Sequence, residues 1–118
     1  MEQVKTFENL IVWRKSIQLT TRIYQITKMF PKEEIFGLGN QLRRAAVSVP
    51  SNIAEGYGRH TRVDYKRFLS ISLGSIYELQ TQLRIGLELE FIPIQEFQET
   101  LNLSKEIDRM LYAIIKKL

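Results

Sequence analysis

The stretch QLRRAAVSVPSNIAEGYGR, residues 41–59, holds the pattern that decides the fold. Its apolar side chains recur at three- and four-residue intervals, which is the period of an α-helix with one buried face. With one residue before the stretch, the stripe consists of Leu38, Leu42, Ala45, Val49 and Ile53. Gly56 and Gly58 follow it, as glycines do at helix C-termini. The pattern predicts a core helix that begins between Pro31 and Gly39 and ends at these two glycines.

Pro50 lies inside this predicted helix. A proline has no N–H to donate to the carbonyl four residues earlier, here that of Ala46. Because the apolar stripe continues through Ile53, we expect a bend at Pro50 rather than a break.

Three further helices are predicted around this one. The first covers about residues 9–29. The next opens at Thr61, where a hydroxyl and the carboxylate of Asp64 form a capping box, and runs to about Phe91. The last begins at Pro93. Four long helices with short connections favour an all-α, antiparallel up-down four-helix bundle, formed by residues 1–118 as a single domain.

The first and last helices carry more apolar surface than a lone bundle buries. The first has two stripes, Leu10, Trp13, Ile17 and Tyr24, and then Val12, Leu19, Ile23, Ile26 and Phe30. The last adds Leu103, Met110 and Tyr112 around its own core stripe. A thick intramolecular core is one explanation, but a surface that self-associates covers the excess better. We therefore expect a homo-oligomer.

Composition excludes several classes of function. The 118 residues include no Cys and one His, so thiolate zinc sites, disulfides and multi-His metal centres are excluded. No apolar run approaches the length of a membrane span, and residues 1–8 lack the apolar stretch of a secretory signal. We expect a cytoplasmic protein that does not enter a membrane and needs no cofactor.

A polar stripe runs beside the apolar one and continues on the third helix. Its members are Gln41, Arg44, Ser48, Asn52, Glu55 and Arg59, and then Ser75, Glu78 and Gln82. A di-metal bundle would need Glu-x-x-His pairs, and His60 stands in no such spacing. We expect a hydrogen-bonded seam between helices or the lining of an oligomer axis. Glu55 is expected to pair with Arg44 or with Arg59.

The net charge of +4 is confined to one part of the chain. Residues 43–67 hold six basic and two acidic residues, and the rest balances. The basic ones are Arg43, Arg44, Arg59, Arg62, Lys66 and Arg67. A solvated basic face is the simple explanation. However, four of these cations surround the start of the third helix, where the helix dipole is already positive and stability gains nothing from them. Such an arrangement suits phosphate groups, and Tyr57, His60 and Tyr65 add rings that could stack on bases.

Several motifs resemble one family of bacterial proteins. Phe7-Glu8-Asn9-Leu10 with Trp13, Gly37-Leu38, and Gln41 to Ser48 resemble the four-helix-bundle proteins encoded in intervening sequences of 23S rRNA genes. The most distinctive match is Asn52-Ile53-Ala54-Glu55-Gly56-Tyr57-Gly58-Arg59. Phe68-Leu69, Gly74-Ser75, Glu78-Leu79 and Arg109-Met110-Leu111 extend it, so that the resemblance spans about residues 7–115.

The resemblance implies a homopentamer. It also implies a relation to the accessory proteins of diversity-generating retroelements, which are basic pentamers that bind nucleic acid and a reverse transcriptase. The leading hypothesis is therefore a non-enzymatic oligomer that binds RNA or other nucleic acid through phosphates, with the six cations as contacts. The alternative is a scaffold that docks a protein partner such as a polymerase. An enzyme is disfavoured, because the sequence has no nucleophile–base pair, Gly-rich phosphate loop or metal set.

Overall fold

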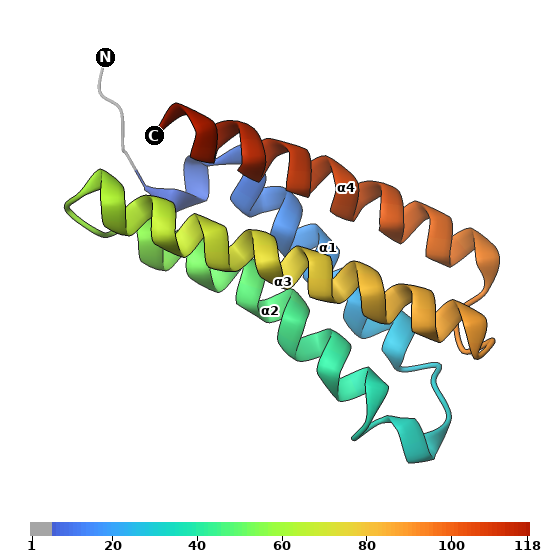
Figure 1. Cartoon of the computed structure of the whole chain (residues 1–118). Coiled ribbons are helices and arrows are strands. Elements are labelled where there is room, and N and C mark those ends of the chain that lie inside the picture. The colour runs from blue at the N-terminus through green and yellow to red at the C-terminus, as the bar shows by residue number, and fades with distance from the viewer. Residues whose placement is uncertain (1–5) are drawn as a thin grey trace.

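The computed structural model describes residues 6–118, and the regular elements in this range are all helical. The long helices are α1 (Ile11–Thr27), α2 (Leu38–Tyr57), α3 (Arg62–Glu88) and α4 (Ile94–Lys117), and two short 3-10 helices are η1 (Phe7–Asn9) and η2 (Lys32–Glu34). The four long helices lie side by side, and both chain ends lie at the same end of the molecule as the α2–α3 connection (Figure 1). The predicted all-α, four-helix fold is confirmed. In residues 6–118 no helix combines the length and the hydropathy that a membrane span requires.

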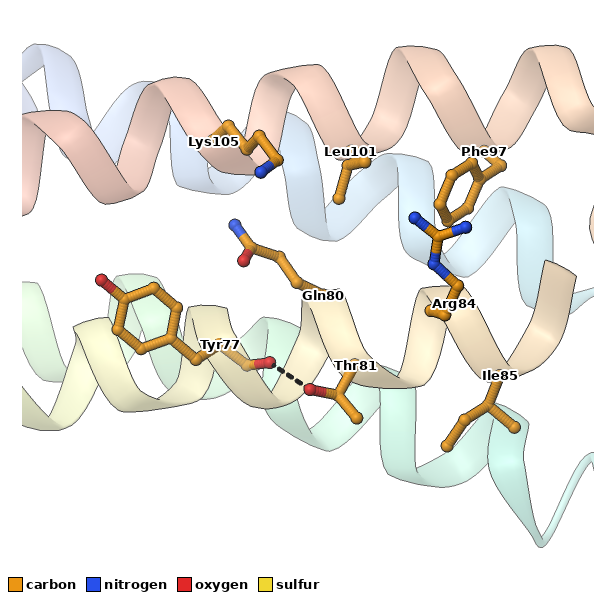
Figure 2. A pocket seen from close by; sticks show the side chains of 8 residues that line it. All are labelled: Tyr77, Gln80, Thr81, Arg84, Ile85, Phe97, Leu101 and Lys105. Carbon is orange, nitrogen blue, oxygen red and sulfur yellow. Dashed lines mark hydrogen bonds between the residues drawn. The ribbon is translucent and has the colours of Figure 1, made fainter. Parts of the chain in front are cut away.

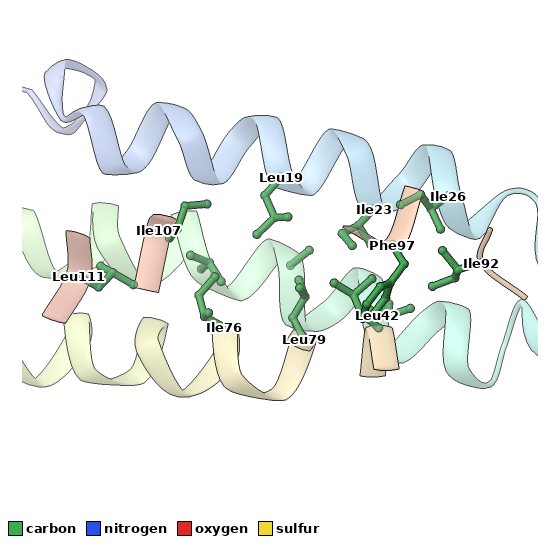
Figure 3. Packing of buried hydrophobic residues seen from close by; sticks show 14 of the residues in the cluster. Leu19, Ile23, Ile26, Leu42, Ile76, Leu79, Ile92, Phe97, Ile107 and Leu111 are labelled. Atoms are coloured by element: carbon green, nitrogen blue, oxygen red, sulfur yellow. The ribbon is translucent and has the colours of Figure 1, made fainter. Parts of the chain in front are cut away.

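The core lies between the four helices along their whole length (Figure 3). All five members of the predicted α2 stripe are buried, and so is the second stripe of α1. The largest fully buried side chains come from every helix and include Leu19, Ile23, Leu42, Ile53, Leu69, Ile76, Leu79, Leu83, Ile107 and Leu111. Burial of this apolar surface is the main force that holds the helices together.

Two helix boundaries differ from the prediction. Helix α1 begins at Ile11 and not near residue 9, because Leu10 is extended and its N–H closes η1 by donating to the carbonyl of Phe7. Helix α3 ends at Glu88 and not near Phe91.

A Schellman motif ends α3. The N–H of Phe91 donates to the carbonyl of Gly86 at 2.8 Å, and the N–H of Glu90 donates to that of Leu87 at 2.9 Å. Glu90 holds the left-handed conformation, with φ of 64°, which glycine usually supplies. The sequence lacks that glycine signal, which is why the prediction extended the helix too far.

Helix α2 is continuous across Pro50, as expected. The proline leaves the carbonyl of Ala46 without its helical donor. The hydroxyl of Thr20 on α1 lies 3.1 Å from that carbonyl oxygen and 2.8 Å from the carbonyl oxygen of Ser16. A side chain of the neighbouring helix therefore offers the hydrogen bond that Pro50 removes.

The most extensive helix contact is between α2 and α3. At Gly56 the two helices approach so closely that a Cβ atom there would lie 2.7 Å from the Cβ of Phe68. Further along, the hydroxyl of Ser72 donates to the carbonyl of Val49 at 2.9 Å. This tight pairing fixes the end of α2 against the start of α3.

Candidate nucleic-acid interface

Helix α3 begins at a capped turn that follows directly on the end of α2. The N–H of Asp64 donates to the hydroxyl of Thr61 at 3.1 Å, which is one half of the predicted capping box. The carboxylate of Asp64 lies 4.0 Å from the guanidinium of Arg67. The chain therefore turns within four residues, 58–61, and places the last residues of α2 beside the first turns of α3.

Four of the six predicted contact residues gather at this turn, and we call them the basic end: Arg59, Arg62, Lys66 and Arg67. All four are exposed. In residues 6–118 no acidic side chain pairs with Arg62 or Lys66. The two amino groups of the basic end that carry no acidic partner thus stand at the positive end of the α3 dipole.

The other two arginines of the basic end are held by their surroundings. Arg59 makes an ion pair with Glu55 at 2.6 Å, which settles the choice of partner for that carboxylate. The guanidinium carbons of Arg59 and Arg67 lie 4.8 Å and 4.5 Å from the centre of the Phe68 ring. Both distances are within the range of cation–π attraction. The side chains of the ion pair are about half exposed, at 41% and 53%, so that the pair adds little to stability.

The rings at this end differ in what they can contact. Tyr57 and Tyr65 pack edge to face, with their centres 6.1 Å apart, and both are partly buried. Burial, together with the neighbouring Tyr57, raises the pKa of Tyr65 above its ordinary value, so the phenol stays neutral at physiological pH. His60 is exposed in the turn. The two tyrosines therefore act mainly as packing between α2 and α3.

Arg43 and Arg44 lie elsewhere. They line a groove of about 470 Å³ between α1 and α2, together with Tyr24, Asn40, Val47 and Ser48. With a rise of 1.5 Å per residue, Arg44 is roughly 20 Å along α2 from its end at Tyr57. The Nε of Arg43 donates to the hydroxyl of buried Thr27 at 2.8 Å, and its guanidinium lies 4.7 Å from the centre of the Tyr24 ring. The predicted set of six cations is therefore divided between two places.

The polar stripe forms a seam between α2 and α3. The hydroxyls of Ser48 and Ser75 lie 2.8 Å apart, and the amide of Asn52 donates to the hydroxyl of Ser48 at 3.0 Å. Near the other end of the seam, the amide of Gln82 donates to the carboxylate of Glu78 at 3.2 Å. In residues 6–118 no group of three His, Asp or Glu side chains is placed to hold a metal ion.

Two grooves carry exposed apolar surface. The first, about 370 Å³, lies between α1 and α2 and is lined by Phe7, Trp13, Ile17, Thr20, Val47, Pro50, Ser51 and Ala54. The second, about 460 Å³, lies between α3 and α4 (Figure 2) and is lined by Tyr77, Gln80, Thr81, Arg84, Ile85, Phe97, Leu101 and Lys105. In it the guanidinium of Arg84 lies 4.9 Å from the centre of the Phe97 ring. Sequence reasoning did not identify the second groove, because its two cations lie on different helices.

Sequence reasoning also missed Phe68 as a residue of the basic end. The signal was an aromatic residue directly after Arg67, within a basic segment. The prediction assigned the ring to the core, and the structure instead shows it partly buried, with two guanidinium groups beside it.

The class of protein is thus a small all-α bundle with one basic end and apolar grooves on its sides. A model of the 23S rRNA-intervening sequence proteins matches residues 8–113, and the chain belongs to this family. It is also similar to the crystal structure of a protein of unknown function from the S23 ribosomal protein family of Bacteroides thetaiotaomicron. The two share 29% sequence identity and a TM-score of 0.84, over 90% of this chain and 96% of the other. A search of curated proteins gave no match.

Proposed function

We propose that this chain is a non-enzymatic, homo-oligomeric bundle protein that binds RNA or other nucleic acid through phosphate contacts at its basic end. The observation that carries the proposal is the gathering of four exposed cations at the start of α3, two of them without an acidic partner among residues 6–118. Each cation placed there opposes the helix dipole by a few tenths of a kcal/mol, so their function is to meet an anion. The reading favours phosphate contacts with little recognition of bases, in the cytoplasm.

Salt dependence tests this proposal. Binding to a single-stranded oligouridylate should weaken log-linearly with salt, by about 0.7 for each phosphate contact. Four contacts in one subunit give a slope near −3. The double variant Arg62→Ala with Lys66→Ala should keep its melting temperature, lose affinity and lower the slope by about 0.7 per contact.

The matched control is Lys28→Ala with Lys32→Ala, which removes two exposed cations near the α1–α2 connection. This control should bind like the parent protein. Equal affinity of the Arg62/Lys66 double variant and the parent at low salt would exclude the basic end as the nucleic-acid site.

The homo-oligomer is supported by exposed apolar side chains on an antiparallel up-down bundle. Ile17, Tyr24 and Val47 are about 40% exposed and lie along the α1–α2 grooves. A soluble monomer rarely leaves such patches uncovered. Five subunits is the number that the family resemblance implies. Light scattering should give a mass well above the 13.9 kDa of one chain, and a monomer at micromolar concentration would contradict the oligomer.

A second candidate function is a scaffold that docks a protein partner such as a polymerase. The observation that favours it is the α3–α4 groove, where Arg84 and Lys105 flank the apolar side chain of Leu101 (Figure 2). Such a groove suits a segment with apolar and acidic residues. Unlabelled RNA should compete with a protein partner if both use the basic end, and should leave that partner bound if it uses the groove.

A further inference from the structure

The two arginines beside Phe68 lie closer to one another than exposed cations usually do. Their guanidinium carbons are 4.8 Å and 4.5 Å from one ring centre, so they cannot be further apart than the sum of these distances. Two positive charges so close repel each other and would separate if their side chains were unrestrained. The ring contacts on both, and the carboxylates of Glu55 and Asp64 near one each, offset this repulsion.

Phe68 itself is held firmly. It follows the capped first turn of α3, and its Cβ occupies the space that a Cβ at Gly56 would need. A longer side chain at position 56 would push the ring away from α2. The glycine and the close helix contact thus define where the Phe68 ring stands, and the ring in turn defines where the guanidinium groups stand.

We propose that Phe68 is a positioning residue, whose ring holds Arg59 and Arg67 side by side as a preformed pair of cations for neighbouring phosphates of one nucleic-acid strand. The inference rests on the proposed function and adds a division of roles within the basic end. Arg59 and Arg67 are ordered before binding, whereas Arg62 and Lys66 are ordered by the phosphates. Ordering long side chains in advance removes part of the entropy cost of binding.

The test compares Phe68→Leu with Phe68→Tyr. Leucine keeps an apolar side chain against Gly56 but offers no ring, and tyrosine keeps the ring. We expect Phe68→Leu to weaken oligouridylate binding about tenfold and Phe68→Tyr to restore parental affinity. Because the arginines still reach phosphates in Phe68→Leu, the salt slope should stay parental, in contrast to Arg59→Gln, which removes a contact and lowers the slope by about 0.7. Tyr77→Leu removes an exposed ring from the same helix and is the matched control.

A second measurement reports on the side chains without nucleic acid. Relaxation of the ¹⁵Nε nuclei should show greater mobility for Arg59 and Arg67 in Phe68→Leu, and no change for Arg62. Parental affinity or unchanged arginine mobility in Phe68→Leu would overturn the positioning role. A lower salt slope or a lost melting transition in that variant would also overturn it, because the ring would then serve only the fold. A parent protein that fails to bind oligouridylate refutes the proposed function itself, and with it this role.

Discussion

Arg43 and Arg62 belong to the same basic segment of the sequence, and their surroundings differ at every level. Arg43 lies between α1 and α2, donates to the buried hydroxyl of Thr27 and stands beside the Tyr24 ring. Arg62 is exposed at the start of α3 and has no acidic partner among residues 6–118. The first cation is part of the packing, and the second opposes the dipole of its own helix. Charge density along the sequence does not distinguish these roles; the contacts of each side chain do.

The largest expected effect concerns the packing beneath the basic end. Gly56→Ala brings a methyl group to 2.7 Å from the Cβ of Phe68, on two helices that cannot separate without loss of core contacts. Overpacking of this kind costs about 2 kcal/mol. We expect the free energy of unfolding to fall by that amount in urea titrations, and nucleic-acid affinity to fall as well because the Phe68 ring moves. Parental stability would mean that the α2–α3 contact is looser than the structure shows.

Gly74→Ala is the matched control for this change. Gly74 lies on the exposed side of α3, and a Cβ there meets no atom within 4 Å. Alanine has the higher helix propensity, so this variant should be slightly more stable than the parent, by up to about 1 kcal/mol.

The second prediction tests the contrast between Arg43 and Arg62 directly. Arg43→Ala removes a hydrogen bond from a charged donor and a ring contact, which together should lower the free energy of unfolding by about 1.5 kcal/mol. Its effect on nucleic-acid affinity should be small. Arg62→Ala should show the reverse pattern, with unchanged stability and weaker binding. If thermal melting and binding titrations gave both variants the same profile, the division of the basic segment into two places would lose its meaning for function.

The sequence was sufficient for the fold because the fold depends on local pattern. The stripe from Leu42 to Ile53 has a helical period, and Thr61 marks the start of α3 with a known cap. The C-terminus of α3 was missed because Glu90 holds a conformation that the cooperative Schellman hydrogen bonds impose, against the preference of the residue.

The candidate site was only partly predictable for a different reason. Charge along the chain identified the basic segment, but the partner of Arg43 is Thr27, 16 residues earlier and on another helix. The contact between Phe68 and Arg59 likewise forms only when α2 and α3 pack. Contacts of this kind arise from tertiary structure, and no periodicity in the sequence encodes them.

A smaller effect is expected at Pro50, which lies on α2 between the two places where cations gather. Pro50→Ala restores an N–H that competes with Thr20 for the carbonyl of Ala46, and it removes a buried ring. The gain in helix propensity and the loss of packing oppose each other. The net change in the free energy of unfolding should therefore stay within about 1 kcal/mol, with helical circular dichroism intact. A collapse of the helical signal would show that the proline shapes an essential interface.

The smallest effect concerns the one acid that contacts the basic end from α2. Glu55→Gln keeps the shape of the side chain and removes its charge, so that Arg59 loses its ion pair but keeps its place beside Phe68. Stability should change by only a few tenths of a kcal/mol, because both side chains of the pair are about half exposed. Affinity for oligouridylate should rise about threefold at low salt, since the carboxylate no longer competes with phosphate for Arg59, and the gain should shrink as salt screens the charges. Glu33→Gln makes the same change of net charge on η2 and should leave affinity unchanged, which separates a local effect from a global one. If Glu55→Gln binds more weakly than the parent, the carboxylate orients Arg59 for the phosphate instead of competing with it, and Phe68 alone does not hold the pair.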